Sequence, residues 1–304
     1  MNPTLKMERF DWLLLLLLAT LWGSSFLFMK IATLDLPVFT VVVGRIGIAG
    51  LLLTLFIYLR GLRFPFDRAF WFEMFLLGFL RAALPISLFV WASTQIDSNI
   101  SGILNSTTPL FTAIIAHFLT QDERLNGQRI VGVLCGMGGV VLLVGIDALA
   151  GLGNNLAGQL AVLGATCSYG FAGVYGRRVR DLPVAVTTAA MLLASTLLIL
   201  PLSLWQAPPW TLQLTLPSAA SVLALAIFNT AIAFMVWLTI VRRAGANNSS
   251  QVTFIIPLVA IVLGFLVLGE QPSWSALAGL LFILLGLAIA QGSLKLPADD
   301  TPPT

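Results

Sequence analysis

The chain has 304 residues, of which 58% are hydrophobic and only 10% are charged. A soluble domain carries about 25% charged residues, so this composition excludes an ordinary soluble fold and favours a lipid bilayer as the surrounding solvent. The formal net charge of +3 comes from short loops between apolar runs, which is typical of a membrane protein and argues against a nucleic-acid partner.

Apolar runs of about 20 residues recur along the chain, and a run of that length crosses the hydrocarbon core as a helix. The first begins with the leucine run 13–18. Because nine more runs follow and no small-residue cleavage site does, we interpret it as a span rather than a signal peptide. The predicted spans are 12–32, 37–59, 70–92, 98–119, 128–146, 156–177, 183–204, 217–240, 247–268 and 274–292. They predict an all-α integral membrane protein with ten transmembrane helices, followed by a disordered tail at 297–304.

The distribution of basic residues predicts the orientation, because Lys and Arg concentrate in cytoplasmic loops. With a cytoplasmic N-terminus, 13 of the 16 basic residues lie on the inner side: Lys6, Arg9, Arg60, Arg63, Arg68, Arg124, Arg129, Arg177, Arg178, Arg180, Arg242, Arg243 and Lys295. The other three, Lys30, Arg45 and Arg81, lie within spans. We therefore predict a multi-pass protein of the cell inner (plasma) membrane with both termini in the cytoplasm.

The chain also repeats itself. Tyr169 follows Trp22 by 147 positions, and Glu270 follows Glu123 by the same number. Further matches within one position of that offset are Lys30 with Arg177, Pro37 with Pro183, Trp91 with Trp237 and Pro109 with Pro257. The repeat divides the chain into halves 1–148 and 149–296, each with five spans. Because five is odd, the second half enters the membrane upside down, which is the signature of alternating-access transporters with a site at the repeat interface.

Some of these residues resemble the motifs of a known family. The segment 21–26 (Leu-Trp-Gly-Ser-Ser-Phe), ending in Lys30, resembles the first-span motif of EamA-type members of the drug/metabolite transporter superfamily. Pro109 followed by the acidic loop 122–124 resembles the fourth span of that family, and Pro257 followed by Glu270 repeats it. The resemblance implies a ten-helix exporter of metabolites, notably amino acids. Within the family, the chain most resembles the branch of bacterial aromatic amino acid exporters.

The resemblance also implies a central cavity between the halves, lined by spans one, three, four, six, eight and nine. The second half departs from the first-span motif, with Ser168-Tyr169-Gly170 in place of Leu21-Trp22-Gly23. Individual substrate contacts are therefore not carried over from the family.

Two arginines deep in predicted spans are the first candidates for a site. At about 1.5 Å per residue, Arg45 lies about 12 Å from the outer end of its helix and Arg81 about 16 Å from the inner end of its own. A guanidinium near the bilayer centre costs at least about 2.5 kcal/mol. Each is therefore either a carboxylate-binding or gating charge facing a water-filled path, or a structural arginine bonded between helices. Glu73, near the inner end of its span, is a further gating or structural charge.

Polar side chains within spans are the second group of candidates. Asn105 shares one face of span four with Ser and Thr residues at helical spacing. Gln251 lies on a similar face of span nine, and Asn229 interrupts an apolar stretch of span eight. Such side chains either line a cavity or bond neighbouring helices.

Four aromatic residues at related positions of the repeat are the third group. Trp22 and Tyr169 lie about half a helix from the membrane surface, where they are placed to pack on an apolar or aromatic substrate. Trp91 and Trp237 lie nearer to helix ends, where membrane tryptophans usually act as interfacial anchors.

Other patterns narrow the function. The phosphate-loop, zinc-protease and nucleophile-elbow motifs are missing, and no acid lies near the predicted midplane, so we expect no enzymatic activity. The cysteines, Cys135 and Cys167, lie in apolar runs, so we expect no disulfide, metal or cofactor. His117, near the end of span four, is expected to be structural. We expect the partners of the protein to be a small-molecule substrate and the bilayer. The alternative functions are drug efflux or uptake by a carrier of the same fold, and a membrane scaffold without transport.

Glycines repeat at short intervals along spans five and ten. Small residues let membrane helices approach closely. These spans therefore form either the interface between the halves or the surface of a dimer, and the chain is predicted to be a monomer or a weak homodimer.

Overall fold

The structure is a computed structural model that describes residues 7–120, 125–149, 153–179, 182–292 and 294, with the side chains of 144–149, 153–155 and 246–247 left undescribed. Within these residues every regular element is helical. The first half contributes α1 (Arg9–Ala32), α2 (Val38–Leu59), the interrupted helix α3–η1–α4 (Arg68–Gly78, Phe79–Ala83, Leu84–Ala92), the pair α5–α6 (Ser98–Asn105, Thr108–Leu119) and α7 (Gly127–Leu149).

The second half repeats this order. It contributes α8 (Gly153–Tyr175), α9 (Val184–Gln206), α10–η4–α11 (Leu216–Ala226, Ile227–Ile232, Ala233–Ala244), α12–α13–η5 (Ala246–Ser249, Val252–Leu263, Gly264–Leu268) and α14 (Trp274–Ala290), with short 3-10 turns η2 (Gly176–Val179) and η3 (Pro209–Thr211). The ten predicted spans are confirmed to within four residues at each end. Six of the described helices are long and apolar enough to cross a membrane, and shorter apolar helices accompany them.

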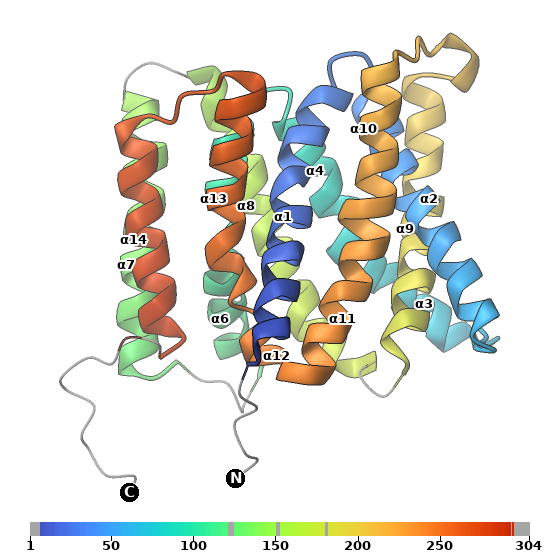
Figure 1. Cartoon of the computed structure of the whole chain (residues 1–304), viewed down its shortest axis with the longest axis horizontal. Coiled ribbons are helices and arrows are strands. Elements are labelled where there is room, and N and C mark those ends of the chain that lie inside the picture. Colours follow the sequence, from blue (N-terminus) through green and yellow to red (C-terminus); the bar gives the residue numbers. More distant parts are fainter. Residues whose placement is uncertain (1–6, 121–124, 150–152, 180–181, 293, 295–304) are drawn as a thin grey trace, which may run out of the picture.

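The two halves run in opposite directions. In Figure 1, α1 leads away from the end of the molecule where both termini lie, whereas α8 starts at the opposite end and leads back. The contacts of the first-span glycines show the same symmetry. A Cβ at Gly23 would lie 2.6 Å from Val259 on α13, and one at Gly170 would lie 3.1 Å from the Thr112 nitrogen on α6. The inverted repeat predicted from the sequence is thus the organising symmetry of the fold.

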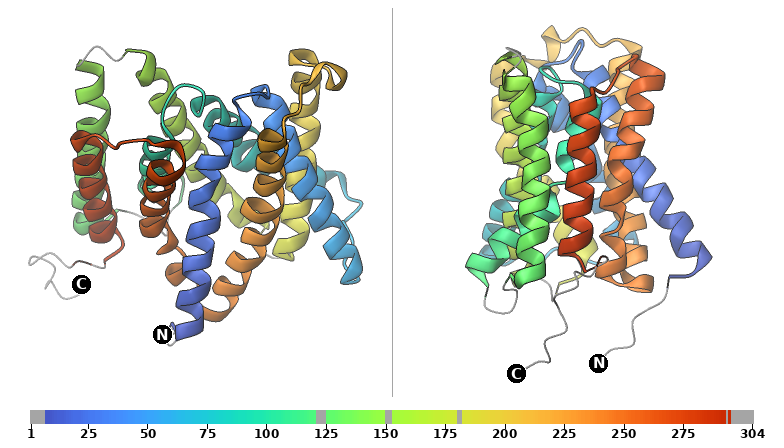
Figure 2. Two further views of the ribbon diagram at one scale, coloured as in Figure 1. Left: turned by 45° about the horizontal axis from the view of Figure 1, so that its top comes forward. Right: turned by 90° about the vertical axis from the view of Figure 1, so that its left-hand side faces the viewer.

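Equivalent helices of the two halves pair at the two ends of the molecule, α7 with α14 and α2 with α9 (Figures 1 and 2). The α7–α14 pair is so close that a Cβ at Gly132 would lie 2.5 Å from the Ala290 nitrogen, and one at Gly139 would lie 2.6 Å from the Gly279 oxygen. The glycines of spans five and ten therefore join the halves, the first of the two roles expected for them.

Spans three and eight are interrupted at equivalent places by π-helical turns, η1 and η4. Span four breaks near Asn105, because Pro109 has no N–H to donate to the Asn105 carbonyl. Thr108 Oγ1 donates to that carbonyl instead, at 2.8 Å. Membrane helices tolerate such breaks when side chains satisfy the freed carbonyls.

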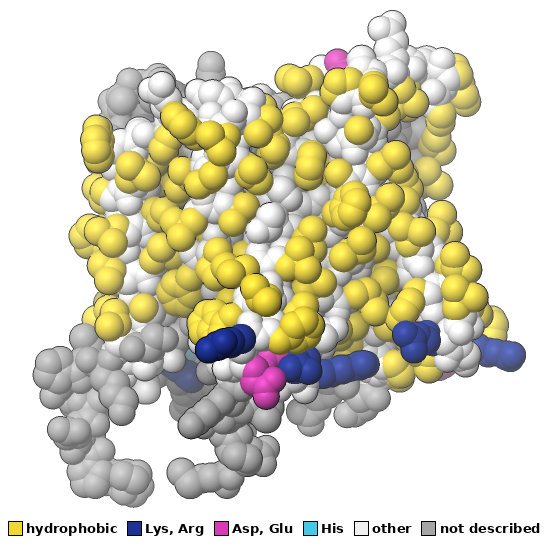
Figure 3. Space-filling view, viewed as in Figure 1, with side chains coloured by type: hydrophobic (Ala, Val, Ile, Leu, Met, Phe, Trp, Pro, Cys, Tyr) yellow, Lys and Arg dark blue, Asp and Glu magenta, His cyan; other side chains and the backbone are white. Residues whose placement is uncertain are grey.

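The surface matches a bilayer environment. Hydrophobic side chains cover the face shown in Figure 3, and Lys and Arg gather along the edge near the chain termini. Exposed leucines on α1, such as Leu13 and Leu16, belong to this apolar belt. A surface of this kind is unfavourable in water and stable in lipid.

Candidate substrate cavity

A cavity of about 290 Å³ lies between the halves. Both halves contribute to its wall: Leu77, Arg81, Ala172, Gly173, Gly176, Val179, Val184, Thr187, Thr188, Met191, Phe234 and Trp237. The wall extends from the middle of span three to the end of α8 and the start of α9, so it lies in the half of the molecule nearer to the termini. The contribution of α9 was not predicted from the sequence.

Among the described residues of this wall, Arg81 is the one that carries a charge. It lies in the η1 turn, and among the described residues no hydrogen bond or ion pair satisfies its guanidinium. The side chain is enclosed by protein but keeps accessible surface, because it borders the cavity. An enclosed, unpaired guanidinium next to a cavity is a site for an anionic group.

Arg45 and Tyr169 belong to the same region. The Arg45 Nε donates to Thr230 Oγ1 at 3.2 Å, and its Nη1 lies 3.5 Å from the Met29 sulfur. The Tyr169 hydroxyl lies within electrostatic range of both guanidinium groups, that of Arg45 and that of Arg81. Of these three residues, Arg81 lies in the cavity wall, and Arg45 and Tyr169 are not part of it.

Aromatic rings lie next to Tyr169 and in the cavity wall. Phe89 stacks on Tyr169 with ring centroids 5.9 Å apart, and Phe26 meets Phe89 edge-on at 5.8 Å. Phe234 and Trp237, both in the cavity wall, lie 5.6 Å apart. Aromatic side chains provide a large contact area for an apolar or planar ligand at low entropic cost.

Asn229 has a different setting. It is 1% exposed, and its amide nitrogen donates to the Leu21 carbonyl and, at 2.9 Å, to Ser24 Oγ. These bonds join η4 to α1, so the amide nitrogen serves helix packing. Trp22, next to this contact, is half-buried and packs against the apolar core rather than in the cavity wall.

Other sequence-predicted residues lie outside the cavity wall. Asn105 and Gln251 are half-buried at helix breaks in spans four and nine. Trp91 is 38% exposed near the end of α4, as an interfacial residue would be. Glu73 lies on α3, nearer than Arg81 to the end of the molecule with the termini, and interacts with Tyr175. The guanidinium carbon of Arg178 lies over the Tyr175 ring, 4.9 Å from its centroid. The wall of the cavity does not include any of these four.

A buried carboxylate joins the halves at the end of the molecule away from the termini. Glu270 is 8% exposed and accepts hydrogen bonds from the Ser98 backbone nitrogen at 2.8 Å, from Ser98 Oγ at 2.8 Å and from the Asn99 nitrogen at 3.0 Å. It therefore caps the start of α5, where unpaired N–H groups favour negative charge. Partial burial and the nearby Glu270 charge raise the pKa of the neighbouring Asp97 carboxyl.

Lys30 reinforces this end of the molecule. Its Nζ donates to the Ile96 carbonyl at 2.9 Å and ties the end of α1 to the loop before α5. Glu270 was recognised in the sequence only as part of the repeat, because capping by a residue 172 positions away leaves no local pattern.

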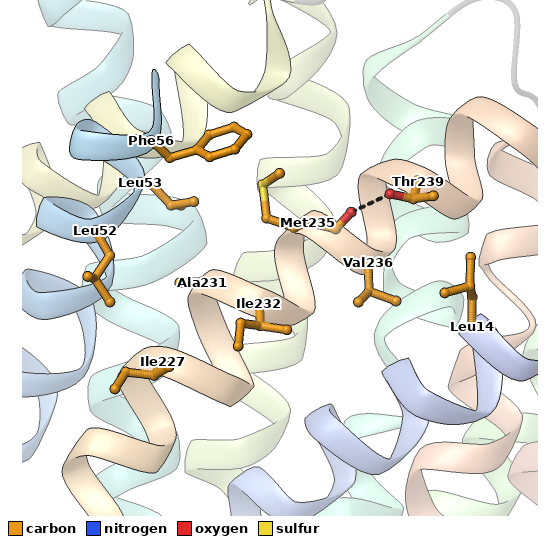
Figure 4. Close-up of a pocket in the computed structure, with 10 residues that line it drawn as sticks. All are labelled: Leu14, Leu52, Leu53, Phe56, Ile227, Ala231, Ile232, Met235, Val236 and Thr239. Atoms are coloured by element: carbon orange, nitrogen blue, oxygen red, sulfur yellow. Dashed lines mark hydrogen bonds between the residues drawn. The ribbon is translucent and has the colours of Figure 1, made fainter. Parts of the chain in front are cut away.

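A second hollow is apolar. This groove of about 350 Å³ lies between α1, α2 and the η4–α11 segment (Figure 4). Its one polar side chain, Thr239, donates to the Met235 carbonyl at 2.9 Å. Wall residues such as Leu52 and Ile232 are 38% and 40% exposed. With no free polar group to orient a substrate, the groove is suited to lipid acyl chains rather than to a metabolite.

Thr230 and Ser168 are the residues that sequence reasoning missed. Thr230 Oγ1 accepts the hydrogen bond of Arg45, and Ser168 Oγ donates to the Leu80 carbonyl at 2.6 Å inside the η1 turn. A single hydroxyl in a membrane helix is too common to mark a site, and only the tertiary contact identifies it.

Known proteins are similar to this chain in sequence and in fold. The model of the EamA-like transporter family matches twice, over residues 10–145 and 156–291. The chain is 24% identical over 272 residues to "Uncharacterized transporter YoaV" of Bacillus subtilis, covering 88% of this chain and 91% of the relative. It is 28% identical over 287 residues to "Uncharacterized inner membrane transporter YedA" of Escherichia coli, covering 91% of this chain and 90% of the relative.

A third relative, "Protein PecM" of Dickeya dadantii, is 27% identical over 274 residues, covering 89% of this chain and 88% of the relative. A solved crystal structure shares the fold with a TM-score of 0.62 at 21% identity, covering 93% of this chain and 98% of its own. The twofold family match covers most of the chain and coincides with the two inverted halves. The chain therefore belongs to the EamA-like transporter family, within the drug/metabolite transporter superfamily, and is a multi-pass membrane transporter.

Proposed function

We propose that this protein is a secondary transporter that exports amino acids or similar small amphipathic metabolites across the inner membrane by alternating access. The observation that carries the proposal is the cavity between the inverted halves, with the unpaired Arg81 guanidinium in its wall. In transporters built from inverted repeats, the substrate site lies at the repeat interface near the bilayer midplane. A carboxylate would bind Arg81, while Phe234 and Trp237 would contact an apolar side chain.

The two ends of the molecule support a gated path. At the end away from the termini, Glu270 holds the start of α5 against the second half, and Lys30 ties the loop before α5 to α1. At the opposite end, the cavity reaches η2 and the start of α9. This arrangement corresponds to a state that is closed on one side and accessible from the other.

The orientation follows from charge. Within the described residues, arginines occupy helix ends on the side of the termini: Arg9, Arg60, Arg68, Arg129, Arg177, Arg178, Arg242 and Arg243. Basic residues favour the cytoplasm, so the termini and the accessible side of the cavity face inward. The name of the Escherichia coli relative agrees with an inner-membrane location. A cavity that opens to the cytoplasm suits the loading step of an exporter.

Counterflow in liposomes tests the proposal. Purified protein is reconstituted into vesicles that contain an unlabelled amino acid, and uptake of the labelled compound is followed over time. A transporter gives a transient accumulation that empty vesicles and a denatured sample lack. A membrane scaffold gives none, and absence of counterflow over a broad panel of metabolites would contradict the proposal. The same panel, loaded with hydrophobic drugs, tests the alternative of drug efflux.

A further inference from the structure

The charges of the site point to a more specific substrate class. Arg45 and Arg81 are both enclosed by protein, and both retain accessible surface. One phenol, that of Tyr169, lies within electrostatic range of both. Arg45 is held in place by Thr230, whereas the Arg81 guanidinium makes no hydrogen bond or ion pair within the described residues.

No described acid lies at the depth of these two arginines. Asp11 lies in the first turn of α1 and pairs with Arg243 at 2.7 Å. Glu270 caps α5 at the opposite end, and Glu73 lies eight residues before Arg81, in the middle of α3. At about 1.5 Å per residue, Glu73 is about 12 Å along the helix from Arg81. The middle of the fold therefore carries two positive charges without a fixed counter-charge.

A zwitterion does not compensate this excess. Its carboxylate would be attracted by the guanidinium groups, but its ammonium group would be repelled by them, and no described acid at this depth is available to receive it. An ammonium group in such a site loses its water without gaining an ionic partner. A ligand with a net negative charge is attracted at every point of the same site.

The surrounding rings constrain the rest of the ligand. Phe234 and Trp237 line the cavity, with their ring centroids 5.6 Å apart. The hydroxyls of Thr187 and Thr188 add small polar contacts on α9. An apolar or planar body with a carboxylate at one end fits this combination of walls.

We infer that the preferred cargo is an organic acid with a net negative charge and an apolar or aromatic body, rather than a zwitterionic amino acid. This inference rests on the proposed function and narrows its substrate class. The Arg81 fork binds the carboxylate, and the described cavity wall holds no acid that would accept an ammonium group.

Three ligands with the same phenyl body separate the charge classes. Phenylpyruvate carries one net negative charge, phenylalanine carries none, and phenylethylamine carries a positive charge. Isothermal titration calorimetry on the full-length protein in detergent should give phenylpyruvate the highest affinity. We expect its Kd to be lower than that of phenylalanine by about tenfold or more, a difference of about 1.4 kcal/mol. Phenylethylamine should not bind measurably.

Matched variants assign the preference to the two arginines. Arg81→Gln and Arg45→Gln should each reduce the ratio of phenylpyruvate to phenylalanine affinity, and Arg81→Lys should keep most of it. The exposed Arg63, within the loop 60–67 before α3, offers the control: Arg63→Gln should leave the ratio unchanged. If the glutamine variants do not fold, the wild-type ratio and the lysine variant still decide the question.

Two outcomes overturn the inference. Phenylalanine binding as tight as that of phenylpyruvate would do so, and so would the failure of all three ligands to bind. Counterflow distinguishes this failure from that of the proposed function. Vesicles that exchange phenylalanine without preferring phenylpyruvate would leave the transporter proposal intact, whereas absence of exchange over the whole metabolite panel would contradict the transporter proposal itself.

Discussion

Arg81 and Asn229 occupy equivalent positions in the two halves, each inside a π-helical turn in the middle of its span. Asn229 donates from within its turn to Leu21 and Ser24 on α1. In the other half the corresponding link is made in reverse, because Ser168 on α8 donates to the Leu80 carbonyl of the turn. Arg81 is thereby released from a packing role and borders the cavity. π-Helical turns occur often at functional sites, and here only one of the two carries a charge.

Replacing Arg81 should affect transport more than folding. Arg81→Ala should lower flux per folded molecule by about tenfold or more, since each 1.36 kcal/mol of lost stabilisation is worth a factor of ten in rate. Arg81→Lys should retain partial transport, because it keeps the charge and loses the planar fork. Flux in liposomes, normalised to monodisperse protein, is the measurement. Asn229→Ala is the matched control, expected to lower thermal stability with flux per folded molecule retained. Normal flux from Arg81→Ala would remove Arg81 from the site.

Both termini should face the cytoplasm. A reporter that is active only in the cytoplasm, fused after Lys295, should give a strong signal, and the same reporter inserted within residues 151–155 should give none. A periplasmic reporter at the two positions should give the opposite pattern. Signals from the same side at both positions would contradict the ten-span topology in the cell.

The cavity should be reachable by water from the cytoplasmic side. Gly173 lies in its wall, and an added Cβ there meets Thr112 only at an ordinary contact distance of 3.6 Å. In a background with Cys135 and Cys167 replaced by serine, Gly173→Cys should react with a membrane-impermeant thiol reagent in inside-out vesicles, and substrate should slow the reaction. Gly138→Cys, on the open surface of α7, should stay unlabelled in lipid. Equal labelling of both would place the cavity elsewhere.

The same labelling decides the roles of Asn105 and Gln251. Both are half-buried beside helix breaks and lie outside the cavity wall of this state. If they line the path in another state of the cycle, cysteines at these positions should become reactive when the opposite side opens. Cysteines that stay sealed under all conditions would assign both residues to helix packing.

Glu270 should stabilise the closed end of the molecule. Hydrogen bonds to a charged group contribute about 1.5–3 kcal/mol, and Glu270→Ala would leave the start of α5 uncapped. We expect a lower melting temperature in detergent and faster hydrogen exchange at the amides of Ser98 and Asn99, measured by mass spectrometry. The exposed Glu8, replaced in the same way, should not change exchange at α5. Unchanged protection of α5 in Glu270→Ala would show that the cap is dispensable.

Transport should not depend on a proton gradient. Proton relays in membranes usually use buried Asp, Glu or His, and the described acids lie towards span ends. His117 Nδ1 accepts a hydrogen bond from the Leu125 nitrogen at 3.1 Å, as a structural histidine would. A pH gradient imposed on liposomes should therefore not drive uphill accumulation, and Glu73→Gln should not alter flux. Accumulation that requires Glu73 would contradict the prediction and identify Glu73 as a proton carrier.

The spans and the inverted repeat could be predicted because hydropathy and repeat offsets are properties of the chain itself. Leu13 to Leu18 and the Gly132 to Gly145 region mark membrane helices without any tertiary information. The site was harder to predict. Arg45, Arg81 and Tyr169 were each recognised by depth, but the sequence could not show that Arg81, and neither of the other two, lies in the cavity wall.

Helix breaks were equally hidden. In span four, Pro109 indicates a break in the helix. The π-helical turn η4 contains no proline, and it is stabilised by Thr230 Oγ1, which donates to the Leu225 carbonyl at 2.8 Å. The link from Asn229 to α1 spans more than 200 positions. Such contacts depend on packing between halves, which a single sequence does not encode in any local pattern.

The pairing of α7 with α14 also bears on how the protein is made. The face of α7 that carries Gly132 and Gly139 packs against the backbone of α14. During synthesis, α7 enters the membrane long before α14 leaves the ribosome, so the first half must wait with this face open to lipid. Assembly can be completed only when the last span arrives. A nascent chain released before α14 would therefore present an unpaired glycine face to the quality-control proteases of the membrane.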